Sequence, residues 1–315
     1  MLQRQITLGV SCCLLGEQVR YDGGHKRHHY LTDQLAPHVR FVSVCPEVEC
    51  GLPTPREPMR LHGDVAKPQL VTIRSGHDLT EQLQSWCLHK TNELAALSLR
   101  GFIFKKNSPS CGLHRVKIYQ DKGPPLTSGR GLFAELLTSA FPLMPVEEEG
   151  RLADARLREN FIEQVYCYDR LLQLLAAQPD RAALIRFHTA HKLLLMAHSV
   201  EHYRATGSLV ASQQPFDQLL REYSRLFMAG LRLLATPAKQ TNVLLHCLGY
   251  FKRQLEAWEK HELLALIQRY RAGQLPLIVP VTLFTHYIRR FNQSYLAEQL
   301  YFAPHPDELM LRNHA

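Results

Sequence analysis

Three short apolar runs in the first part of the chain are each followed by a segment that contains cysteine. Residues 6–10 precede SCCLLG, residues 41–44 precede CPE, and residues 102–104 precede NSPSCG. Runs of this length predict buried strands, and parallel strands bring their carboxyl ends to one edge of a sheet, where open α/β sheets bind ligands. The sequence therefore predicts that thiols from three separate loops gather at one site.

The number of these segments bears on the chemistry of that site. Thiolates are ligands for soft metals, and a structural zinc or a fully ligated iron–sulfur cluster takes four protein ligands. A cuboidal cluster held by three thiolates would leave one iron open to act as a Lewis acid. Three cysteine segments therefore indicate a reactive metal site.

Composition limits the class of protein to which the chain belongs. It has 315 residues, of which 45% are hydrophobic and 21% are charged, so it is long enough for two globular domains and is not a disordered protein. The first residues lack the apolar core of a signal peptide, no apolar run approaches the ~20 residues of a membrane span, and the eight cysteines show no disulfide framework. We therefore expect a cytoplasmic protein with free thiols and no membrane partner.

The net charge of +8 is concentrated in the second half of the chain, since residues 151–315 contain 20 Lys and Arg against 14 Asp and Glu. A basic half can attract a polyanion through phosphate neutralisation, although an excess of this size is modest. RNA binding by the second half stays open as an alternative.

The hydrophobic pattern divides the chain into two parts that differ in predicted secondary structure. An α/β pattern extends to about residue 145, and a segment with two prolines, an acidic run and a glycine (residues 141–150) interrupts it. We expect a Rossmann-like α/β domain with a mainly parallel sheet at residues 1–165 and an all-α domain at 166–315. The predicted strands are 6–10, 41–44, 70–73, 101–104 and 115–119, and the predicted helices are 79–98, 130–140, 152–177, 181–205, 215–234, 239–272 (alternatively split near 258) and 280–300.

Longer motifs add a family resemblance. The segments GVSCCLLGEQVRYDGGHKR, CPEVECGLPTPREPMRL, NSPSCG and LRENFIEQVY resemble the thiouracil desulfidase (TudS) family, and RFHTAHKLLLMAHS, NVLLHCLGYFK and YRAGQLPLIVPVTLFTHY resemble the YbgA-type helical domain. The resemblance implies a [4Fe–4S] cluster on three cysteines, an open fourth iron that binds the substrate sulfur, and non-redox, hydrolytic desulfuration of a thiolated pyrimidine such as 2-thiouracil, as base or nucleoside.

The resemblance assigns the cluster ligands to Cys13, Cys45 and Cys111. Cys12 is an alternative to Cys13, but neighbouring side chains in extended backbone point in opposite directions, so we expect only one of them to reach the metal. Cys50 is expected to be a spare thiol. Its alternative role is that of a fourth ligand, which would close the site.

Glu47 and Ser108 are the acid–base candidates. A carboxylate two residues from a ligand cysteine is suitably placed to take a proton from the attacking water, and a serine three residues before Cys111 could hold that water or the base. The alternatives are a capping or ion-paired carboxylate and an ordinary turn serine. For Asp22 we expect an Asx turn.

Basic residues near these motifs have two interpretations. Lys105 and Lys106 would favour an anionic substrate if they point into the site, and the run from His25 to His29 could bind a phosphate. Solvated loops explain both equally well. Arg56, in a proline-rich turn, could orient the base or form a structural ion pair.

The second half offers a less specific pattern. His188, His191, His198 and His202 fall on one broad face of a single predicted helix, where we expect a polar surface rather than a metal site. Three functional hypotheses remain: a desulfidase acting on a free base or nucleoside, a tRNA-directed thiouridine desulfidase, and a non-catalytic iron–sulfur sensing module. The oligomeric state is left open.

Overall fold

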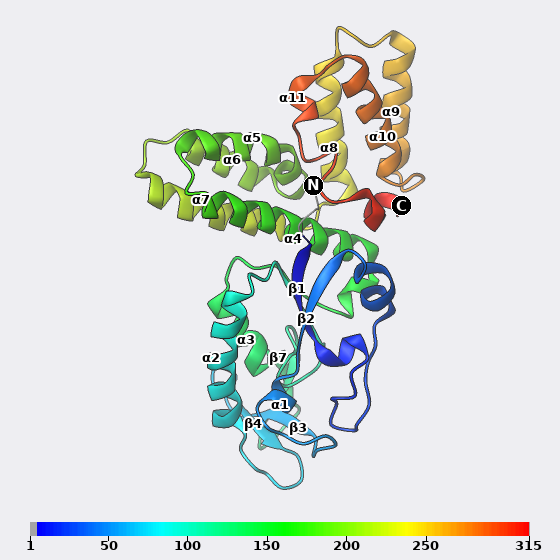
Figure 1. Ribbon diagram of the computed structural model, residues 1–315. Helices are drawn as coiled ribbons and strands as arrows, with labels where there is room; N and C mark the ends of the chain where they lie inside the picture. The colour runs from blue at the N-terminus through cyan, green and yellow to red at the C-terminus, as the bar shows by residue number, and fades with distance from the viewer. Residues whose placement is uncertain (1–4, 315) are drawn as a thin grey trace. The chain divides into compact units, whose positions relative to one another are not determined.

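The structure is a computed structural model that describes residues 5–314 (Figure 1). The chain divides into two compact units, one ending at Ala153 and the other beginning at Asp154. The domain boundary predicted after residue 165 falls inside helix α4 (Ala155–Ala176). The two units are described separately below.

Within the described residues, the first unit contains two sheets and three α-helices, together with shorter 3₁₀ and π turns. In the first sheet the strand order is β2-β1-β5-β8 and all pairs are parallel, which confirms the predicted Rossmann-like, mainly parallel α/β class. The second sheet, β4-β3-β6-β7, is mixed and was not predicted as a separate layer. The bounds are β1 Ile6–Ser11, β2 Val39–Val44, β3 Met59–His62, β4 Gln69–Thr72, β5 Phe102–Phe104, β6 Val116–Tyr119, β7 Leu126–Gly129, β8 Val146–Glu148, α1 Pro46–Glu49, α2 Thr80–Ala96 and α3 Leu132–Ala140.

The core of this unit lies between the parallel sheet and the helices α2 and α3, which lie side by side (Figure 1). Every residue of β1 is buried, as expected for a central strand covered on both faces. Phe133 of α3 packs edge-on against Phe102 and Phe104 of β5, with ring centroids 5.5 and 6.0 Å apart. Trp86 of α2 contacts the same Phe133 ring. These contacts hold β5 firmly, and with it the loop that carries Cys111.

The acidic run at residues 147–149 is not the connecting segment that the sequence suggested. Its residues lie in and next to β8, and all three glutamates are buried. Glu148 accepts hydrogen bonds from the backbone N–H groups of Leu113 and His114, at 2.8 and 3.1 Å. The prediction was wrong because carboxylates usually mark exposed loops, whereas here backbone donors from a distant loop satisfy one of them.

The second unit is all helical, as predicted. Its helices are α4 Ala155–Ala176, α5 Arg181–His198, α6 Val200–Val210, α7 Phe216–Leu231, α8 Pro237–Leu248, α9 Ala257–Arg271, α10 Ile278–Arg290 and α11 Ser294–Ala297. Helices α5, α6 and α7 pack together, and α9 packs against both α8 and α10. Leu219, Tyr223, Phe227 and Leu231 form a fully buried stripe at intervals of four residues on α7, which is the helical period that the sequence pattern reports.

The single helix predicted over 181–205 is wrong, because the chain breaks at Ser199. Ser199 has an extended backbone (φ −158°, ψ 114°), and its hydroxyl accepts a hydrogen bond from the N–H of His202 and so caps α6. The helix predicted over 239–272 is split, as its alternative allowed, and α9 begins with a capping box between Glu256 and Glu259. The helix predicted over 280–300 ends early, at Arg290.

Within residues 5–314, no helix combines the length and the apolar character that crossing a bilayer requires.

Candidate functional site

The three predicted cysteine loops meet at one cavity of about 370 Å³ in the first unit, and Cys13, Cys45 and Cys111 all line it. Cys13 lies in a 3₁₀ turn (Cys12–Leu15) directly after β1. Cys45 follows β2 and is the N-cap residue of α1. Cys111 lies in the loop after β5. Because β2, β1 and β5 are parallel neighbours, their carboxyl ends bring the three thiols to the same edge of the sheet.

Backbone hydrogen bonds hold the first two loops in place. The carbonyl of Cys13 accepts from the N–H of Lys26 at 2.9 Å, and Gly16 ends the 3₁₀ turn with φ +100°, a conformation that favours glycine. The N–H of Cys45 donates to the side chain of Glu49 at 2.8 Å, so the first turn of α1 closes on itself. The thiol positions therefore follow from local turn chemistry.

The loop that carries Cys111 is tighter. The Ser108 hydroxyl accepts hydrogen bonds from the N–H groups of Ser110 (3.3 Å) and Cys111 (3.1 Å), and the N–H of Gly112 donates to the Ser108 carbonyl at 2.8 Å. A Cβ atom on Gly112 would lie 2.7 Å from that carbonyl oxygen. The loop therefore requires glycine after Cys111. It also continues into α3, because the N–H of Phe133 donates to the Ser110 carbonyl at 2.9 Å.

Glu47 lies in the same cavity as the thiols. The Cys45 thiol points to its Oε2 at 3.5 Å, the Ser110 hydroxyl donates to its Oε1, and the Arg56 guanidinium lies 3.9 Å from Oε2. The Ser110 hydroxyl is in turn 2.9 Å from that of Ser108. The Glu47 side chain is 12% exposed, so its carboxylate is largely desolvated and its direction is set by these partners.

Sequence reasoning missed Ser110. It is fully buried and is the direct hydrogen-bond partner of Glu47, whereas the predicted Ser108 contacts Glu47 only through Ser110. The one signal in the sequence was the alternation of the two serines around Pro109, which did not reveal which of them faces the carboxylate. The contact joins residues 63 positions apart in the chain.

The protein environment keeps these thiols neutral in the absence of a positive partner. Burial raises the pKa of Cys13 to about 11, and burial followed by repulsion from Glu47 raises the pKa of Cys45 and of Cys111 further. The charge of Lys105 opposes the shift at Cys13. Deprotonated thiols would need a cationic group between them, and a soft metal group suits such donors. The residues present therefore fit an iron–sulfur cluster, although no three His, Cys, Asp or Glu side chains among the described residues are grouped as ligands of a single ion.

The two further cysteines differ from each other. Cys12 also lines the cavity, and its thiol is hydrogen-bonded to Ser43. The extended backbone assumed for Cys12 and Cys13 is wrong, since a 3₁₀ turn can direct both side chains to one side. Cys50 is not among the residues that line the cavity, and its thiol donates to the Glu47 carbonyl at 3.2 Å.

Five cationic residues line the cavity with Glu47: Arg20, Lys26, Arg56, Lys105 and Lys106. Lys105 pairs with the buried Glu149 at 2.5 Å, and Arg56 donates to the carbonyl of Val19 at 2.9 Å. Lys105 and Arg56 therefore have structural partners, as one interpretation expected. They also line the cavity, as the other interpretation expected.

The other polar motifs of the first unit have internal partners. Asp22 accepts a hydrogen bond from the N–H of Gly24 at 3.1 Å, which is the predicted Asx turn. Arg27 and His29, from the basic run, both contact Asp33, at 2.6 and 3.0 Å. Part of the charge expected to bind a phosphate is therefore neutralised within the chain.

The predicted histidine face in the second unit is wrong. His202 lies on α6, beyond the break at Ser199, and the three histidines of α5 are buried rather than on a polar surface. Desolvation lowers the pKa of His188 to about 4 and that of His191 to about 3. These side chains therefore pack as neutral core residues. His198 instead contacts Glu163 at 3.0 Å.

Comparisons with known proteins agree with this division of the chain. Residues 8–149 match the family described as 2-thiouracil desulfurase, and residues 192–306 match a family described as a protein of unknown function (DUF1722). The uncharacterized protein YbgA of Escherichia coli is 32% identical over 161 residues, which are 50% of this chain and 95% of that protein. The uncharacterized protein YbbK of Bacillus subtilis is 32% identical over 136 residues, 42% of this chain and 89% of that protein.

A solved structure, that of the [4Fe-4S]-dependent thiouracil desulfidase TudS, is 33% identical to this chain, with a TM-score of 0.39 over 48% of this chain and 94% of that one. The fold and the thiol-lined cavity define an α/β protein with a cysteine site, joined to an all-helical domain. The chain belongs to the 2-thiouracil desulfurase family in its first unit and to the YbgA family in its helical unit, which confirms the resemblance seen in the sequence.

Proposed function

We propose that the first unit holds a [4Fe–4S] cluster on Cys13, Cys45 and Cys111 and hydrolytically removes sulfur from a thiolated pyrimidine. The observation that carries the proposal is the position of Glu47, whose carboxylate lies in the thiol-lined cavity and contacts the thiol of Cys45. When bound, the cluster would supply a soft Lewis acid that selects a sulfur-bearing substrate over its oxygen analogue.

The residues around Glu47 suit it to act on water. The reaction replaces C=S by C=O, consumes one water and releases sulfide, so a base must take a proton from the water as it attacks the carbon. The Ser110 hydroxyl and the Arg56 guanidinium orient the carboxylate, and the Ser108 hydroxyl supports Ser110. Ser108 is therefore proposed as an indirect contributor and Glu47 as the base.

The test uses the full chain, reconstituted anaerobically. Iron and sulfide content are measured first, followed by sulfide release and uracil formation from 2-thiouracil. Glu47→Gln keeps the size of the side chain and is expected to abolish turnover without loss of iron, whereas the exposed Glu81→Gln on α2 is the matched control and keeps both. If the cluster forms but no thiolated pyrimidine is desulfurated, the proposal fails and a sensing module is the better interpretation.

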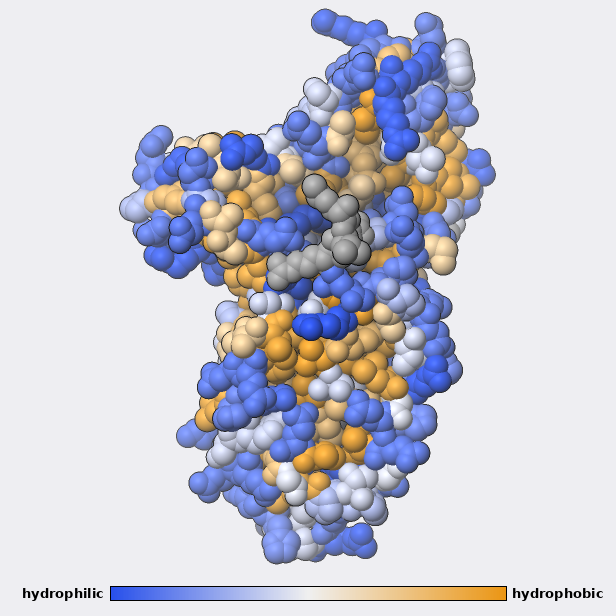
Figure 2. Space-filling view, viewed as in Figure 1, coloured by the Kyte–Doolittle hydropathy of each residue, from blue (hydrophilic) through white to orange (hydrophobic). Residues whose placement is uncertain are grey.

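A thiouridine within tRNA is the second candidate substrate, and the charge of the protein favours it. Five cations line the cavity, of which Arg20, Arg56 and Lys105 have carboxylate partners, which leaves the charges of Lys26 and Lys106 to attract a phosphate. In the second unit the buried charged residues are three glutamates (Glu159, Glu163 and Glu259) and one arginine (Arg312), so the accessible surface is more cationic than the sequence total. Figure 2 shows hydrophilic residues along the outer edges of this unit.

The two substrates are separated by turnover and by salt dependence. A tRNA-directed enzyme is expected to desulfurate thiouridine-bearing tRNA faster than 2-thiouracil, and its affinity for that tRNA should fall steeply as salt rises. Equal binding of tRNA at low and high salt, or turnover of the free base alone, would exclude tRNA as the substrate and favour the free thiolated pyrimidine.

A further inference from the structure

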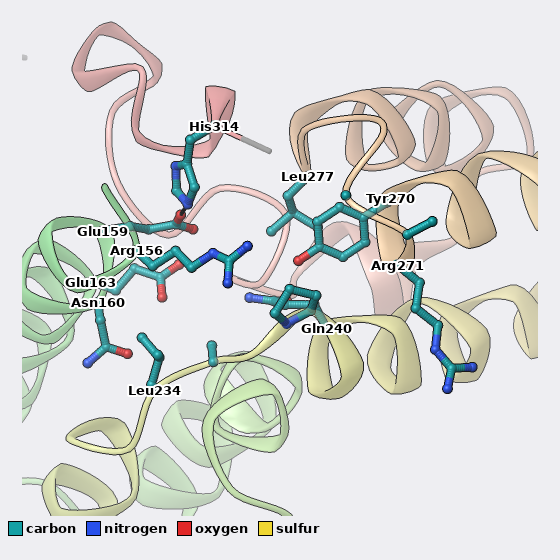
Figure 3. A pocket seen from close by; sticks show the side chains of 14 residues that line it. Arg156, Glu159, Asn160, Glu163, Leu234, Gln240, Tyr270, Arg271, Leu277 and His314 are labelled. Carbon is teal, nitrogen blue, oxygen red and sulfur yellow. Dashed lines mark ion pairs between the residues drawn. The ribbon is translucent and has the colours of Figure 1, made fainter. Parts of the chain in front are cut away.

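The helical unit contains a second cavity, of about 250 Å³, which lies entirely within residues 154–315 (Figure 3). Its walls include Glu159, Asn160 and Glu163 of α4, Gln240 of α8 and Tyr270 of α9. His314 lines it as well. Nothing in the cysteine site of the first unit contributes to this cavity, so its function is a separate question.

One wall of this cavity is a buried network of charges with internal partners. The two oxygens of Glu163 contact His198 at 3.0 Å and Arg312 at 2.8 Å. Glu159 lies 3.5 Å from Arg312 and 3.3 Å from His314. Arg312 also donates to a backbone carbonyl, that of Tyr301, at 2.6 Å. These groups hold α4 and the C-terminal segment together and leave little unsatisfied charge among themselves.

The remaining polar groups of the cavity are only partly satisfied: the Asn160 amide nitrogen donates to the Leu231 carbonyl at 3.3 Å, and the Gln240 amide oxygen accepts from the Tyr301 hydroxyl at 2.8 Å. The Oδ1 atom of Asn160 is buried without a hydrogen-bond partner, although the residue is only 7% exposed. Within the part of the chain that the structure describes, the Arg156 guanidinium makes no ion pair, and neither the Gln240 amide nitrogen nor the Tyr270 hydroxyl donates a hydrogen bond. In Figure 3 the side chains of Arg156, Gln240 and Tyr270 converge.

Unsatisfied buried polar atoms are rare in folded proteins and commonly mark a site where a ligand or an ordered water completes the bonding. The groups that line the cavity are two solvent-exposed arginines (Arg156 and Arg271), two neutral donors on Gln240 and Tyr270, and one buried unpaired acceptor, the Oδ1 atom of Asn160. Apolar contacts from Leu234, Pro237 and Leu277 complete the lining. A ligand that satisfies all of them needs an anionic head group for Arg156 and an N–H or O–H donor for the Asn160 oxygen.

The charge of the cavity agrees with an anionic ligand. Burial, followed by repulsion from Glu163, raises the pKa of Glu159 above its usual value, so this carboxyl contributes less negative charge to the cavity than an exposed glutamate would. Burial lowers the pKa of His314. The negative charge of Glu163 is matched by Arg312, whereas Arg156 and Arg271, both solvent-exposed, make no ion pair among the described residues. A cationic ligand would meet these two guanidinium groups and is disfavoured.

We propose that this cavity is a binding site for a small organic anion, a phosphate monoester or a carboxylate that also carries hydrogen-bond donors. The ligand places its oxyanion at Arg156 and a donor at Asn160. The site does not depend on the proposed desulfuration, because none of its residues belongs to the first unit.

The test is isothermal titration of the full-length protein, reconstituted with its cluster, at low ionic strength. The probes are uridine 5′-monophosphate and glutamate as the two kinds of anion, with uridine as the uncharged control. At least one anion is expected to bind while uridine does not, and which of the two binds separates the phosphate from the carboxylate source. Arg156→Gln is expected to weaken that binding by about tenfold or more, because a charge-assisted bond is lost.

Two control variants keep the result interpretable. Arg269→Gln removes an exposed arginine of α9 that does not line the cavity, and it should leave binding unchanged. Lys105→Ala removes a cation from the cavity of the first unit. The proposal is overturned if neither anion binds, if Arg156→Gln binds as tightly as the wild type, or if Lys105→Ala rather than Arg156→Gln abolishes binding.

Discussion

Glu163 is the residue whose replacement tests the buried charge network most directly. It is 1% exposed and contacts two buried partners, His198 and Arg312, which are 0% and 4% exposed. Glu163→Gln preserves the size of the side chain and removes only its charge. The change leaves the buried guanidinium with one longer carboxylate contact, to Glu159 at 3.5 Å, besides its hydrogen bond to the Tyr301 carbonyl.

The size of the stability loss follows from the burial of the pair, because breaking a buried ion pair by removing one partner costs about 3–5 kcal/mol. Burial alone would raise the pKa of Glu163, but the hydrogen bond from His198 and the charge of Arg312 outweigh it and lower the pKa to about 2. The direction of this shift shows that the folded protein favours the charged carboxylate. Since Glu159 would ionise more readily without Glu163 beside it, part of the loss is recovered, and the lower end of the range is expected.

The assay is urea and thermal unfolding of the full chain followed by far-ultraviolet circular dichroism, which reports mainly on helices. A loss of about 3 kcal/mol in a unit of this size lowers the melting temperature by roughly 6–12 °C. Glu262→Gln, at an exposed position of α9, is the matched control and should change the free energy of unfolding by less than about 0.5 kcal/mol. A loss at Glu163 no larger than that of the control would refute the reasoning.

Acid gives an independent check of the same network. Because the pKa of Glu163 is lower in the folded state, its contribution is complete above pH 4.5 and is lost as the pH falls toward 2. The difference in stability between the wild type and Glu163→Gln should therefore shrink over that range.

A double variant gives a further check. Glu163→Gln combined with Arg312→Met should lose less stability than the sum of the two single variants, because it leaves no unpaired guanidinium.

Three further predictions concern the cysteine site. If Cys13 is the ligand and Cys12 a neighbouring thiol, Cys13→Ala should lose the iron after reconstitution and Cys12→Ala should retain it; equal loss in both variants would contradict this assignment. Ser110→Ala should lower turnover by about 10-fold to 100-fold at unchanged iron content, since it frees the Glu47 carboxylate, and Ser110→Thr should restore part of it; an unchanged rate would show that Ser110 does not position the base. Gly112→Ala should reduce the free energy of unfolding by about 1–3 kcal/mol, measured with urea, because its Cβ would crowd the Ser108 carbonyl; full stability would mean that the loop can shift.

The fold class could be predicted because it depends on local patterns. The order of apolar residues shows the buried run of β1 and the stripe at four-residue intervals on α7. It also shows the change from an α/β pattern to a helical pattern near residue 150. The ends of helices were harder to predict from the sequence. Ser199 interrupts a continuous helical pattern because its hydroxyl caps the next helix, and nothing in the hydrophobic period distinguishes that serine from one inside a helix.

The burial of two carboxylates was not predicted from the sequence. Glu148 and Glu163 both lie in buried positions, although charged residues usually indicate a surface. Each is compensated by groups far away in the chain, the backbone donors of Leu113 and His114 for one and the side chains of His198 and Arg312 for the other. A sequence pattern records the charge of a residue but not the position of its partners.

The sequence alone determined that cysteines follow three strands of a parallel sheet, because strand length and turn chemistry are local properties and parallel strands share one carboxyl edge. Only the tertiary structure decided that Ser110 contacts Glu47, that Cys12 lines the same cavity as Cys13, and that the helical unit encloses a cavity around Asn160. Those features depend on contacts between residues distant in the chain, whose geometry is set by the packing of whole helices and strands.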